Sequence, residues 1–337
     1  MCLAHYTRRD FLALTTAVAG GLAASATLGG EAAAAPAPSL VPPATQRDLT
    51  AGMIDFHVHT YPDNFDRTVS AVEAARTAKE RGMRAIVLKG GAFETVTRAA
   101  EARAAVPGIE VFGGVVLNWY SGGLNPAAVQ AMVDLRGGGS ERLGRVVWMP
   151  SLQARNHYQR FNIPGQPVDV FDGTQLLPAA REILALCADY DLVLQTCHLS
   201  PPEALALLRE ARAMGVQRLV CTHADYDPIN MSLDDQREAA RLGAFIEHAY
   251  IGVYLGPDSP AERFRSWRGA TVEQMARAIN ATGAESAILS SDMGAAPLGI
   301  PADGYAAFVE ELQRHGITDH ELDLMGRRNP AALLDLD

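Results

Sequence analysis

Short apolar runs recur along the chain after residue 50, and several of them are followed by a stretch with helical periodicity. Eight of these runs are expected to be strands, at residues 53–59, 84–89, 110–117, 145–150, 192–198, 218–223, 244–254 and 286–292. Helices are expected at about residues 68–81, 95–105, 179–188 and 203–214. The run at residues 85–88 is apolar throughout, which is typical of a parallel strand buried on both faces.

Eight strand and helix units of this kind predict an α/β chain that folds as a closed (β/α)8 TIM barrel, with its reactive groups at the carboxyl ends of the strands. An open doubly wound sheet is the rival, but no glycine-rich phosphate turn follows the first expected strand. The 337 residues and their 48% hydrophobic share suit one large domain. A net charge of −10 argues against binding to nucleic acid or to an anionic membrane.

The first fifty residues differ from the rest. Arg8 and Arg9 precede a weakly apolar, glycine-broken run at 13–28 and a small-residue stretch at 31–36. This order resembles a twin-arginine export signal, which predicts a signal peptide at 1–35, a Pro/Ala/Ser linker at 36–50 and the barrel at 51–337. The resemblance implies contact with the twin-arginine export machinery and a periplasmic or extracellular location. An uncleaved membrane anchor is the rival.

The first expected strand ends in two histidines one residue apart, His57 and His59. Side chains at i and i+2 of a strand share a face, so both imidazoles are expected to point the same way from its carboxyl end. Asp55 lies on that face one pleat earlier, where it would orient or crowd the site. Imidazole is the commonest metal ligand among side chains, so the pair predicts a metal site, with an ordinary exposed strand as the alternative.

Other polar residues stand at the ends of later expected strands. The fifth strand ends in His198, the sixth continues through His223, and the eighth ends in Asp292. Each of them alone is explained equally well as a hydrogen-bonded core residue. Four histidines and one aspartate on a single rim are harder to explain that way, because bare imidazoles and a carboxylate packed together without a cation are poorly satisfied.

With these residues in place, the sequence resembles the amidohydrolase superfamily of metal-dependent barrel hydrolases. The matching features are the rim residues and a tail at 329–334 that reads Asn-Pro-Ala-Ala-Leu-Leu. The resemblance implies that His57 and His59 bind a first divalent ion, expected to be Zn²⁺, with Asp292 as ligand and proton shuttle. It also implies that His198 joins that ion or a second one, and that His223 binds the second ion or polarises the substrate carbonyl.

The sequence departs from many members of that superfamily at the end of the fourth expected strand, where residues 145–151 contain no lysine or glutamate to bridge two ions. Lys89 ends the second strand instead, after four apolar residues, where an unpaired ammonium is costly. Three roles stay open for it: a carboxylated lysine that bridges two ions, a cation that holds a substrate carboxylate, or an ion pair with Asp55 or Glu247. Of Glu247 and its neighbour His248, at most one points inward.

Three connections after strands are long or unusual, at residues 118–123, 153–177 and 256–267. Loops at the reactive face of a barrel commonly shape or cover the pocket. A solvated polar flap is the alternative for residues 153–177. The candidate substrate-binding residues are Trp119, Tyr120, Arg155 and His157.

These features predict an enzyme, a metal-dependent hydrolase in which metal-activated water attacks an amide, lactone or ester carbonyl of a small molecule. The expected catalytic residues are Asp292, His223 and Lys89, and Lys89 is also a candidate metal ligand. One alternative is a metal-dependent decarboxylase of a small carboxylic acid, because some superfamily relatives without the strand-four bridge are decarboxylases. Another is a barrel that binds metal without turnover. One or two ions fit the pattern, and a homo-oligomer is left open.

Overall fold

The computed structural model describes residues 49–139 and 141–336. The predicted signal peptide at 1–35 lies outside these residues, as does nearly all of the predicted linker at 36–50, so both stay predictions together with export. Every helix in the described ranges is too short or too polar to span a bilayer.

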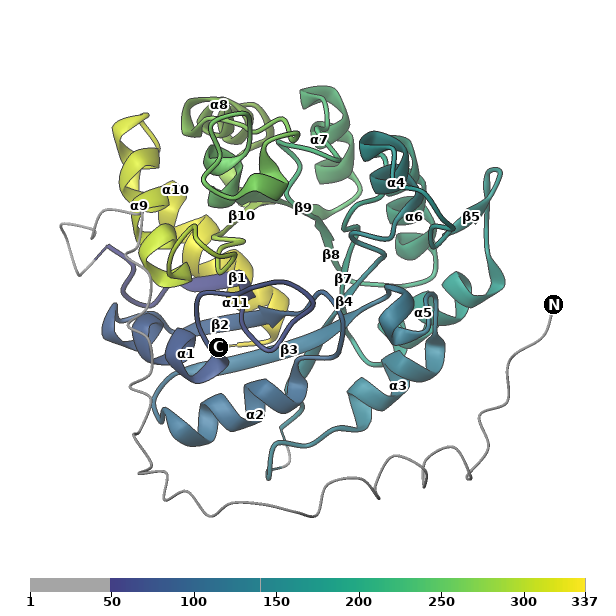
Figure 1. The fold of residues 1–337 in the computed structure, drawn as a ribbon, viewed down its shortest axis with the longest axis horizontal. Helices are drawn as coiled ribbons and strands as arrows, with labels where there is room; N and C mark the ends of the chain where they lie inside the picture. The colour runs from purple at the N-terminus through teal and green to yellow at the C-terminus, as the bar shows by residue number, and fades with distance from the viewer. Residues whose placement is uncertain (1–48, 140, 337) are drawn as a thin grey trace, which may run out of the picture. The chain divides into compact units, whose positions relative to one another are not determined.

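An eight-stranded parallel sheet forms the centre of the described chain, in the order β1-β2-β3-β4-β7-β8-β9-β10. Figure 1 shows the strands arranged as a ring. Their positions agree with the eight expected runs, within a few residues at each end. The strands are β1 (Ile54–His59), β2 (Ala85–Lys89), β3 (Glu110–Val116), β4 (Gly144–Trp148), β7 (Val193–Gln195), β8 (Arg218–Cys221), β9 (Ala244–Ala249) and β10 (Ala287–Ser290).

The ring closes where the chain beyond β10 runs beside β1. The amide of His59 donates to the carbonyl of Met293 at 3.0 Å, and the amide of Asp292 donates to the carbonyl of His57 at 2.9 Å. The predicted (β/α)8 barrel is therefore confirmed. Closure also places Asp292 beside the two histidines near the end of β1.

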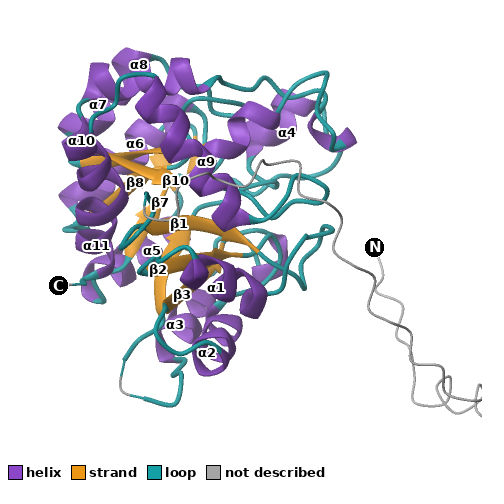
Figure 2. Ribbon diagram, turned by 90° about the vertical axis from the view of Figure 1, so that its left-hand side faces the viewer, coloured by secondary structure: helices purple, strands orange, loops and turns teal. Residues whose placement is uncertain are grey.

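Helices surround the sheet on its outside (Figure 2). The four expected helices correspond to α1, α2, α5 and α6. A capping box starts α1, because the hydroxyl of Ser70 accepts from the amide of Glu73 and the Glu73 carboxylate accepts in return. The helices are α1 (Ala71–Glu80), α2 (Val96–Ala105), α3 (Pro126–Asp134), α4 (Arg155–Phe161), α5 (Pro178–Asp189), α6 (Pro201–Ala213), α7 (Leu233–Arg241), α8 (Val272–Thr282), α9 (Pro301–Arg314), α10 (Asp319–Asp323) and α11 (Asn329–Leu334).

Two predicted elements differ from the structure near the carboxyl face. Residues 250–254, expected as the end of a strand, form the 3-10 helix η2 (Tyr250–Tyr254), because the backbone turns after β9 and the amide of Ile251 donates to the carbonyl of Ser291. Residues 153–177, expected as a loop, contain α4 and a hairpin of β5 (Phe171–Asp172) and β6 (Gln175–Leu176). Both segments rise above the strand ends and supply walls of the site.

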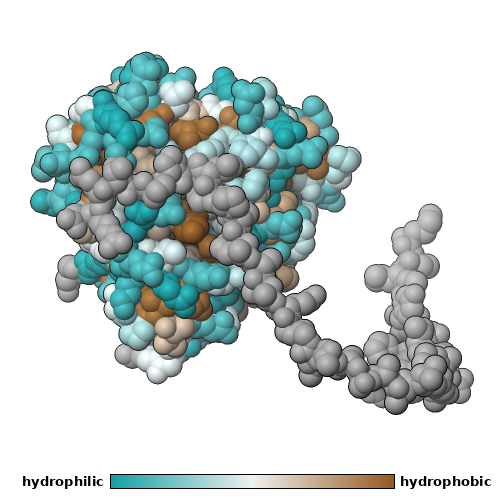
Figure 3. Space-filling model, turned by 60° about the vertical axis from the view of Figure 1, so that its left-hand side comes forward, coloured by the Kyte–Doolittle hydropathy of each residue, from teal (hydrophilic) through white to brown (hydrophobic). Residues whose placement is uncertain are grey.

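Burial of apolar side chains holds the strands and helices together. Trp148, Phe56 and Phe112 are among the largest side chains that are completely buried. The face shown in Figure 3 is mostly hydrophilic, with hydrophobic side chains in separate small areas. The large apolar side chains therefore lie mainly in the interior, and their burial is the dominant favourable contribution to the free energy of folding.

Asn329, at the start of α11, ties the tail to the amino end of β10. Its buried side-chain amide donates to the carbonyls of Ala284 and Ala287 at 2.9 and 2.7 Å. The tail motif at 329–334 thus supports the strand that leads to Asp292 at its other end.

Replacing Asn329 by alanine should lower the free energy of unfolding by about 1–3 kcal/mol, because two buried carbonyls lose their donor. Chemical denaturation measures this change. The exposed Asn280 on α8 is the matched control, and Asn280→Ala should change stability by less than about 0.5 kcal/mol. Equal stability of Asn329→Ala and wild type would show that this amide does not anchor the tail.

Candidate metal centre and cavity

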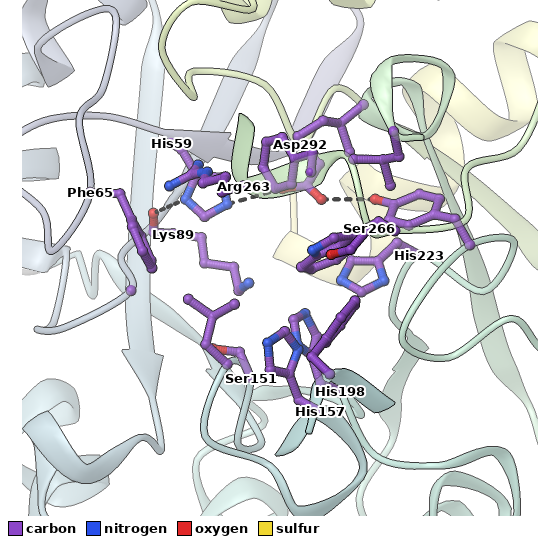
Figure 4. A pocket seen from close by; sticks show the side chains of 18 of the residues that line it. His59, Phe65, Lys89, Ser151, His157, His198, His223, Arg263, Ser266 and Asp292 are labelled. Carbon is purple, nitrogen blue, oxygen red and sulfur yellow. Dashed lines mark hydrogen bonds and ion pairs between the residues drawn. The ribbon is translucent and has the colours of Figure 1, made fainter. Parts of the chain in front are cut away.

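A cavity of about 270 Å³ opens at the carboxyl ends of the strands. His57 lies directly behind it, fully buried against Asp292. The structure therefore brings together all six residues that the sequence predicts as metal ligands or catalytic groups, five of which are labelled in Figure 4. The other five, which line the cavity, are His59, Lys89, His198, His223 and Asp292.

Three of these residues are close enough to share one ion. The ligand atoms of His57, His59 and Asp292 all lie within 4.8 Å of one another. Nε2 of His57 is 3.0 Å from Oδ1 of Asp292, and Nε2 of His59 is 2.9 Å from the same oxygen. His198 and His223 line the cavity but do not belong to this close group.

The opposite nitrogens of the two imidazoles are anchored. Nδ1 of His59 is 3.0 Å from the carbonyl oxygen of Lys89, and Nδ1 of His57 is 3.2 Å from Oε1 of Glu247. Carbonyl and ionised carboxylate oxygens only accept hydrogen bonds, so each Nδ1 donates its proton. Each Nε2 is then the nitrogen that faces Asp292 and that would offer a lone pair to a cation between them. Nε2 of His57 is buried and has no hydrogen-bond partner within the described residues.

This donor set fits a divalent cation. Two imidazole lone pairs beside one carboxylate oxygen are poorly satisfied unless a positive charge lies between them. Burial lowers the pKa of His59 well below its ordinary value, so its imidazole does not supply that charge at neutral pH. Burial would raise the pKa of Asp292, but His57 and His59 hold it well below its usual range, so the carboxylate is ionised. Two nitrogens and a carboxylate oxygen are ligands that zinc takes.

Glu247 on β9 supports the group from behind. Its carboxylate accepts from Nδ1 of His57 and from the amide of His223, the latter at 3.0 Å. Burial would raise the pKa of Glu247, but His57 and its hydrogen bonds lower it below the ordinary value. His248 points elsewhere and pairs with Asp225 at 2.7 Å. Only one of the two adjacent residues therefore faces the site, as predicted.

The backbone turns sharply beyond the ends of three strands. Cys197, His223 and Asp292 have φ angles of 51°, 27° and 51°, in the left-handed region that non-glycine residues rarely occupy. Each of them stands two residues beyond the end of its strand, which is β7, β8 and β10 respectively. Such backbone costs on the order of 1–3 kcal/mol per residue and concentrates at functional sites. These bends set the directions of His198, His223 and Asp292 at the cavity.

Tyr226 lies against Asp292, and no sequence signal pointed to it beyond its place three residues after His223. Its hydroxyl donates to Oδ2 of Asp292 at 2.8 Å, and its ring stacks on His223 with centroids 4.9 Å apart. Burial raises the pKa of Tyr226 well above its ordinary value, so the hydroxyl stays a donor. Asp292 therefore has one oxygen facing two histidines and the other held by a tyrosine.

His157 and His198 form a second pair, across the cavity from His59 and Asp292 (Figure 4). Their Nδ1 atoms are 3.0 Å apart, so one donates and the other accepts. Burial lowers the pKa of His157 to about 4 and that of His198 well below its ordinary value, so both are neutral at pH 7. The predicted place of His157 at the pocket agrees with the structure, and its contact with substrate stays a prediction.

Lys89 extends into the middle of the cavity and is only 5% exposed (Figure 4). Within residues 49–139 and 141–336, its Nζ has no hydrogen bond or ion pair. The pair considered with Asp55 or Glu247 does not form, because Asp55 accepts from backbone amides and Glu247 is held by His57. The other two roles, a carboxylated bridge or a cation for substrate, stay predictions.

Three of the four candidate substrate-binding residues do not line this cavity, and their contact with substrate stays a prediction. Trp119 and Tyr120 are 44% and 52% exposed, and the indole of Trp119 donates to the carbonyl of Gln166. Arg155 is paired with Asp169 at 2.5 Å, on the surface. Arg155 stands two residues before His157 on α4, and helical residues two apart do not face the same way. One of the two could reach the cavity, and it is His157.

Two of the three long connections do shape the cavity, as predicted. Residues 153–177 contribute His157, Phe161 and Ile163, and residues 256–267 contribute side chains described below. The segment 118–123 contributes none of the lining. Several other lining residues were not predicted from the sequence, because their only signal was a position in a segment beyond a strand end. They are Phe65, Arg67, Arg263, Phe264, Ser266 and Trp267. The last four belong to the connection at residues 256–267.

Residues 52–247 match the model of a protein family that is described as a family of unknown function, DUF6282. This range is more than half of the chain. The chain belongs to this family. The matched range includes both histidines of β1, Lys89, His198 and His223, and it ends at Glu247, before Asp292. A comparison with curated proteins finds no match.

Solved structures with a similar fold include three barrels of low sequence identity. An amidohydrolase from Burkholderia multivorans with bound zinc is 16% identical, with a TM-score of 0.56 over 85% of this chain and 100% of its own. A mutant PTE-like lactonase from Deinococcus radiodurans is 15% identical, with a TM-score of 0.55 over 85% and 97%. The TatD homolog YjjV from Escherichia coli is 15% identical, with a TM-score of 0.51 over 86% and 100%. The resemblance to amidohydrolases is thereby confirmed at the level of the fold.

Replacing Tyr226 by phenylalanine should weaken zinc binding by about tenfold to a hundredfold, because Asp292 loses the hydrogen bond that orients it. Competition titration against a chelating dye measures the affinity without any need for a substrate. The exposed Tyr120 is the matched control, since Tyr120→Phe removes a hydroxyl outside the cavity and should leave zinc affinity unchanged. An unaltered affinity in Tyr226→Phe would show that Asp292 keeps its orientation unaided.

Buried histidines should make the metal-free protein less stable as the pH falls. The pKa of His157 is about 4 in the folded chain against an ordinary 6.5, so between these values the unfolded chain binds a proton that the folded chain does not. The contribution of neutral His157 to the free energy of unfolding is complete above pH 6.5 and is lost as the pH falls toward 4. The slope of the free energy of unfolding against pH is at most about 1.4 kcal/mol per pH unit.

Urea denaturation at a series of pH values through this window measures the slope. His157→Gln should make it shallower, whereas His320→Gln, on an exposed position of α10, should leave it as in wild type. The same slope in both variants would contradict the assignment of a neutral, buried His157.

Proposed function

We propose that the protein is a metal-dependent hydrolase that acts on the amide, lactone or ester carbonyl of a small molecule. The observation that carries this proposal is the convergence of Nε2 of His57 and Nε2 of His59 on Oδ1 of Asp292, while both Nδ1 atoms are anchored elsewhere. Two neighbours of similar fold support it, since one is an amidohydrolase with bound zinc and the other is a lactonase.

His57, His59 and Asp292 are the residues that would hold the ion, and zinc is the ion of this proposal. When bound, zinc would act as a Lewis acid on the carbonyl and lower the pKa of water toward neutrality. The rings of His198 and His223 have centroids 5.0 Å apart at the same cavity. These two imidazoles would be the ligands of a second ion, and the number of zinc ions per chain tests whether one binds.

The chain's own groups supply the remaining chemistry. Asp292 is ionised, and its carboxylate takes the proton of the attacking water and passes it to the leaving group. Lys89 places an unpartnered positive charge in the cavity, where it stabilises the negative charge that develops on the carbonyl oxygen. Burial lowers the pKa of His223 to about 4, so it serves there as a neutral hydrogen-bonding group.

A metal-dependent decarboxylase of a small carboxylic acid is the second candidate. It is favoured by the free cation of Lys89 and by the end of β4, where Trp148 is followed by Met149 and Pro150 instead of a bridging residue. Release of carbon dioxide from a carboxylic acid would favour this reaction over hydrolysis. A barrel that binds zinc and turns over neither substrate class would fit the remaining alternative, a binding protein.

His57→Ala should reduce the zinc content of the purified protein from at least one ion per chain to well below one, because one of three close ligands is lost. Elemental analysis gives the stoichiometry, and a panel of neutral lactones, esters and amides gives the activity, which should fall with the zinc. His320→Ala is the control, since this histidine is exposed on α10.

The same measurement can contradict the proposal. The proposed metal centre would be contradicted by wild-type protein that holds less than one ion per chain after incubation with zinc. It would also be contradicted by full zinc occupancy in His57→Ala. Full zinc occupancy of wild-type protein without turnover of any carbonyl substrate would contradict the hydrolase function but not the metal centre.

A further inference from the structure

We propose that the substrate carries a carboxylate, and that Arg263 binds it beside the rings of Phe65 and Phe264. This inference rests on the proposed function and names its substrate class: a small lactone, ester or amide with an apolar body and one carboxylate. It concerns a residue that sequence reasoning did not single out. Arg263 belongs to the 3-10 helix η3 (Glu262–Phe264), inside the connection 256–267.

Arg263 is a charged residue of the cavity that forms no ion pair with any described residue, although Asp292, Asp63 and Asp66 lie near enough to attract it. Within the described residues its guanidinium has no ion pair or hydrogen bond, and its Nε is buried and unpartnered. Burial and the neighbouring Arg67 lower its pKa to about 10, which still leaves it cationic at neutral pH. A partly desolvated guanidinium that makes no direct contact with a carboxylate is costly, so an anion that enters the cavity and pairs with it would be stabilised.

Other arginines nearby are already neutralised. Arg67, which also lines the cavity, donates twice to Asp63, at 2.9 and 2.6 Å. Arg160 lies farther out and is paired with Asp227 at 2.5 Å. Among the arginines that line the cavity in the described chain, Arg263 is therefore the one available to an incoming anion.

Two aromatic rings lie close to the guanidinium of Arg263. Its guanidinium carbon lies 4.4 Å from the ring centroid of Phe65 and 4.5 Å from that of Phe264. Such rings stabilise the cation by cation–π attraction and make no hydrogen bond with its N–H groups. Those N–H groups can therefore meet a carboxylate through two parallel hydrogen bonds.

The rest of the cavity fits the other parts of such a substrate. Phe161, Trp267 and Leu255 add apolar walls, and the volume of about 270 Å³ suits a small molecule. Arg263, His59 and Asp292 all line this cavity, and Figure 4 shows Lys89 pointing into it. A substrate held by its carboxylate at Arg263 would therefore present its reactive carbonyl to the metal group and to Lys89.

Calorimetric titration of benzoate into the zinc-loaded protein tests this assignment. Arg263→Gln should weaken benzoate binding by about tenfold or more, because a charge-assisted bidentate contact is lost. Arg263→Lys keeps the charge but not the fork, and we expect a smaller but measurable loss. Benzamide, a neutral molecule of the same shape, should bind wild type more weakly than benzoate and be insensitive to both substitutions.

Arg265 provides the matched control, since it stands two residues away with its Nε bonded to the carbonyl of Ser259, and Arg265→Gln should bind benzoate as wild type does. Zinc content and thermal unfolding of every variant verify that it is folded and loaded. Benzoate affinity that is unchanged in Arg263→Gln and Arg263→Lys overturns the inference. So does inorganic phosphate that binds at Arg263 more tightly than benzoate.

The proposed function and this inference fail in different ways. If zinc-loaded protein hydrolyses neutral esters but its binding of benzoate does not depend on Arg263, the hydrolase function would be supported. The proposed carboxylate of the substrate would be contradicted. If the protein binds benzoate through Arg263 but hydrolyses no substrate, the anion-binding site would be supported. The hydrolase function would then be contradicted.

Discussion

The geometry of the candidate metal centre depends on two hydrogen bonds that fix the orientation of two imidazoles. Nδ1 of His59 is held by the backbone carbonyl of the last residue of β2, and Nδ1 of His57 by Glu247 on β9. The oxygen that both Nε2 atoms face belongs to Asp292, just beyond β10. A slip of one residue in the pairing of any of these strands would turn its side chains to the other face. Barrel closure prevents that slip, because β1 is paired on one side with β2 and on the other with the chain beyond β10.

Much of this arrangement could be predicted from the sequence because it follows from strand geometry. His57 and His59 are two residues apart on one strand, and His198, His223 and Asp292 each come at the end of an apolar run. In a closed parallel barrel, such ends meet at one rim. Which of Glu247 and His248 faces inward could not be predicted in the same way. That choice depends on the register of β9 against β10, in which Glu247 pairs with Ile288, and a periodicity of two leaves it open.

The walls of the cavity could not be predicted, because tertiary contacts place them. Arg155 and His157 looked equally suitable as polar residues of one loop, and only the helix that the loop contains sends one outward and the other inward. Arg263 lies on a turn whose position is set by packing of Phe264 and Trp267, 5.4 Å apart between ring centroids. The left-handed backbone of His223 and Asp292 could not be predicted either, because histidine and aspartate tolerate this conformation more often than most residues but do not require it.

The surroundings of Asp292 limit how it can move a proton. Oδ2 accepts from Tyr226, whose raised pKa keeps its own proton in place, and Oδ1 faces Nε2 of His57 and Nε2 of His59. Burial and stacking on His223 hold the Tyr226 ring, so Oδ2 is not readily freed. In the proposed hydrolysis, Oδ1 is therefore the oxygen that would take a proton from water. The same atom faces the ion site, so proton uptake and ion binding at Asp292 would oppose each other. His57 and His59 hold the pKa of Asp292 well below its usual range, so the carboxylate would pass such a proton readily to a leaving group.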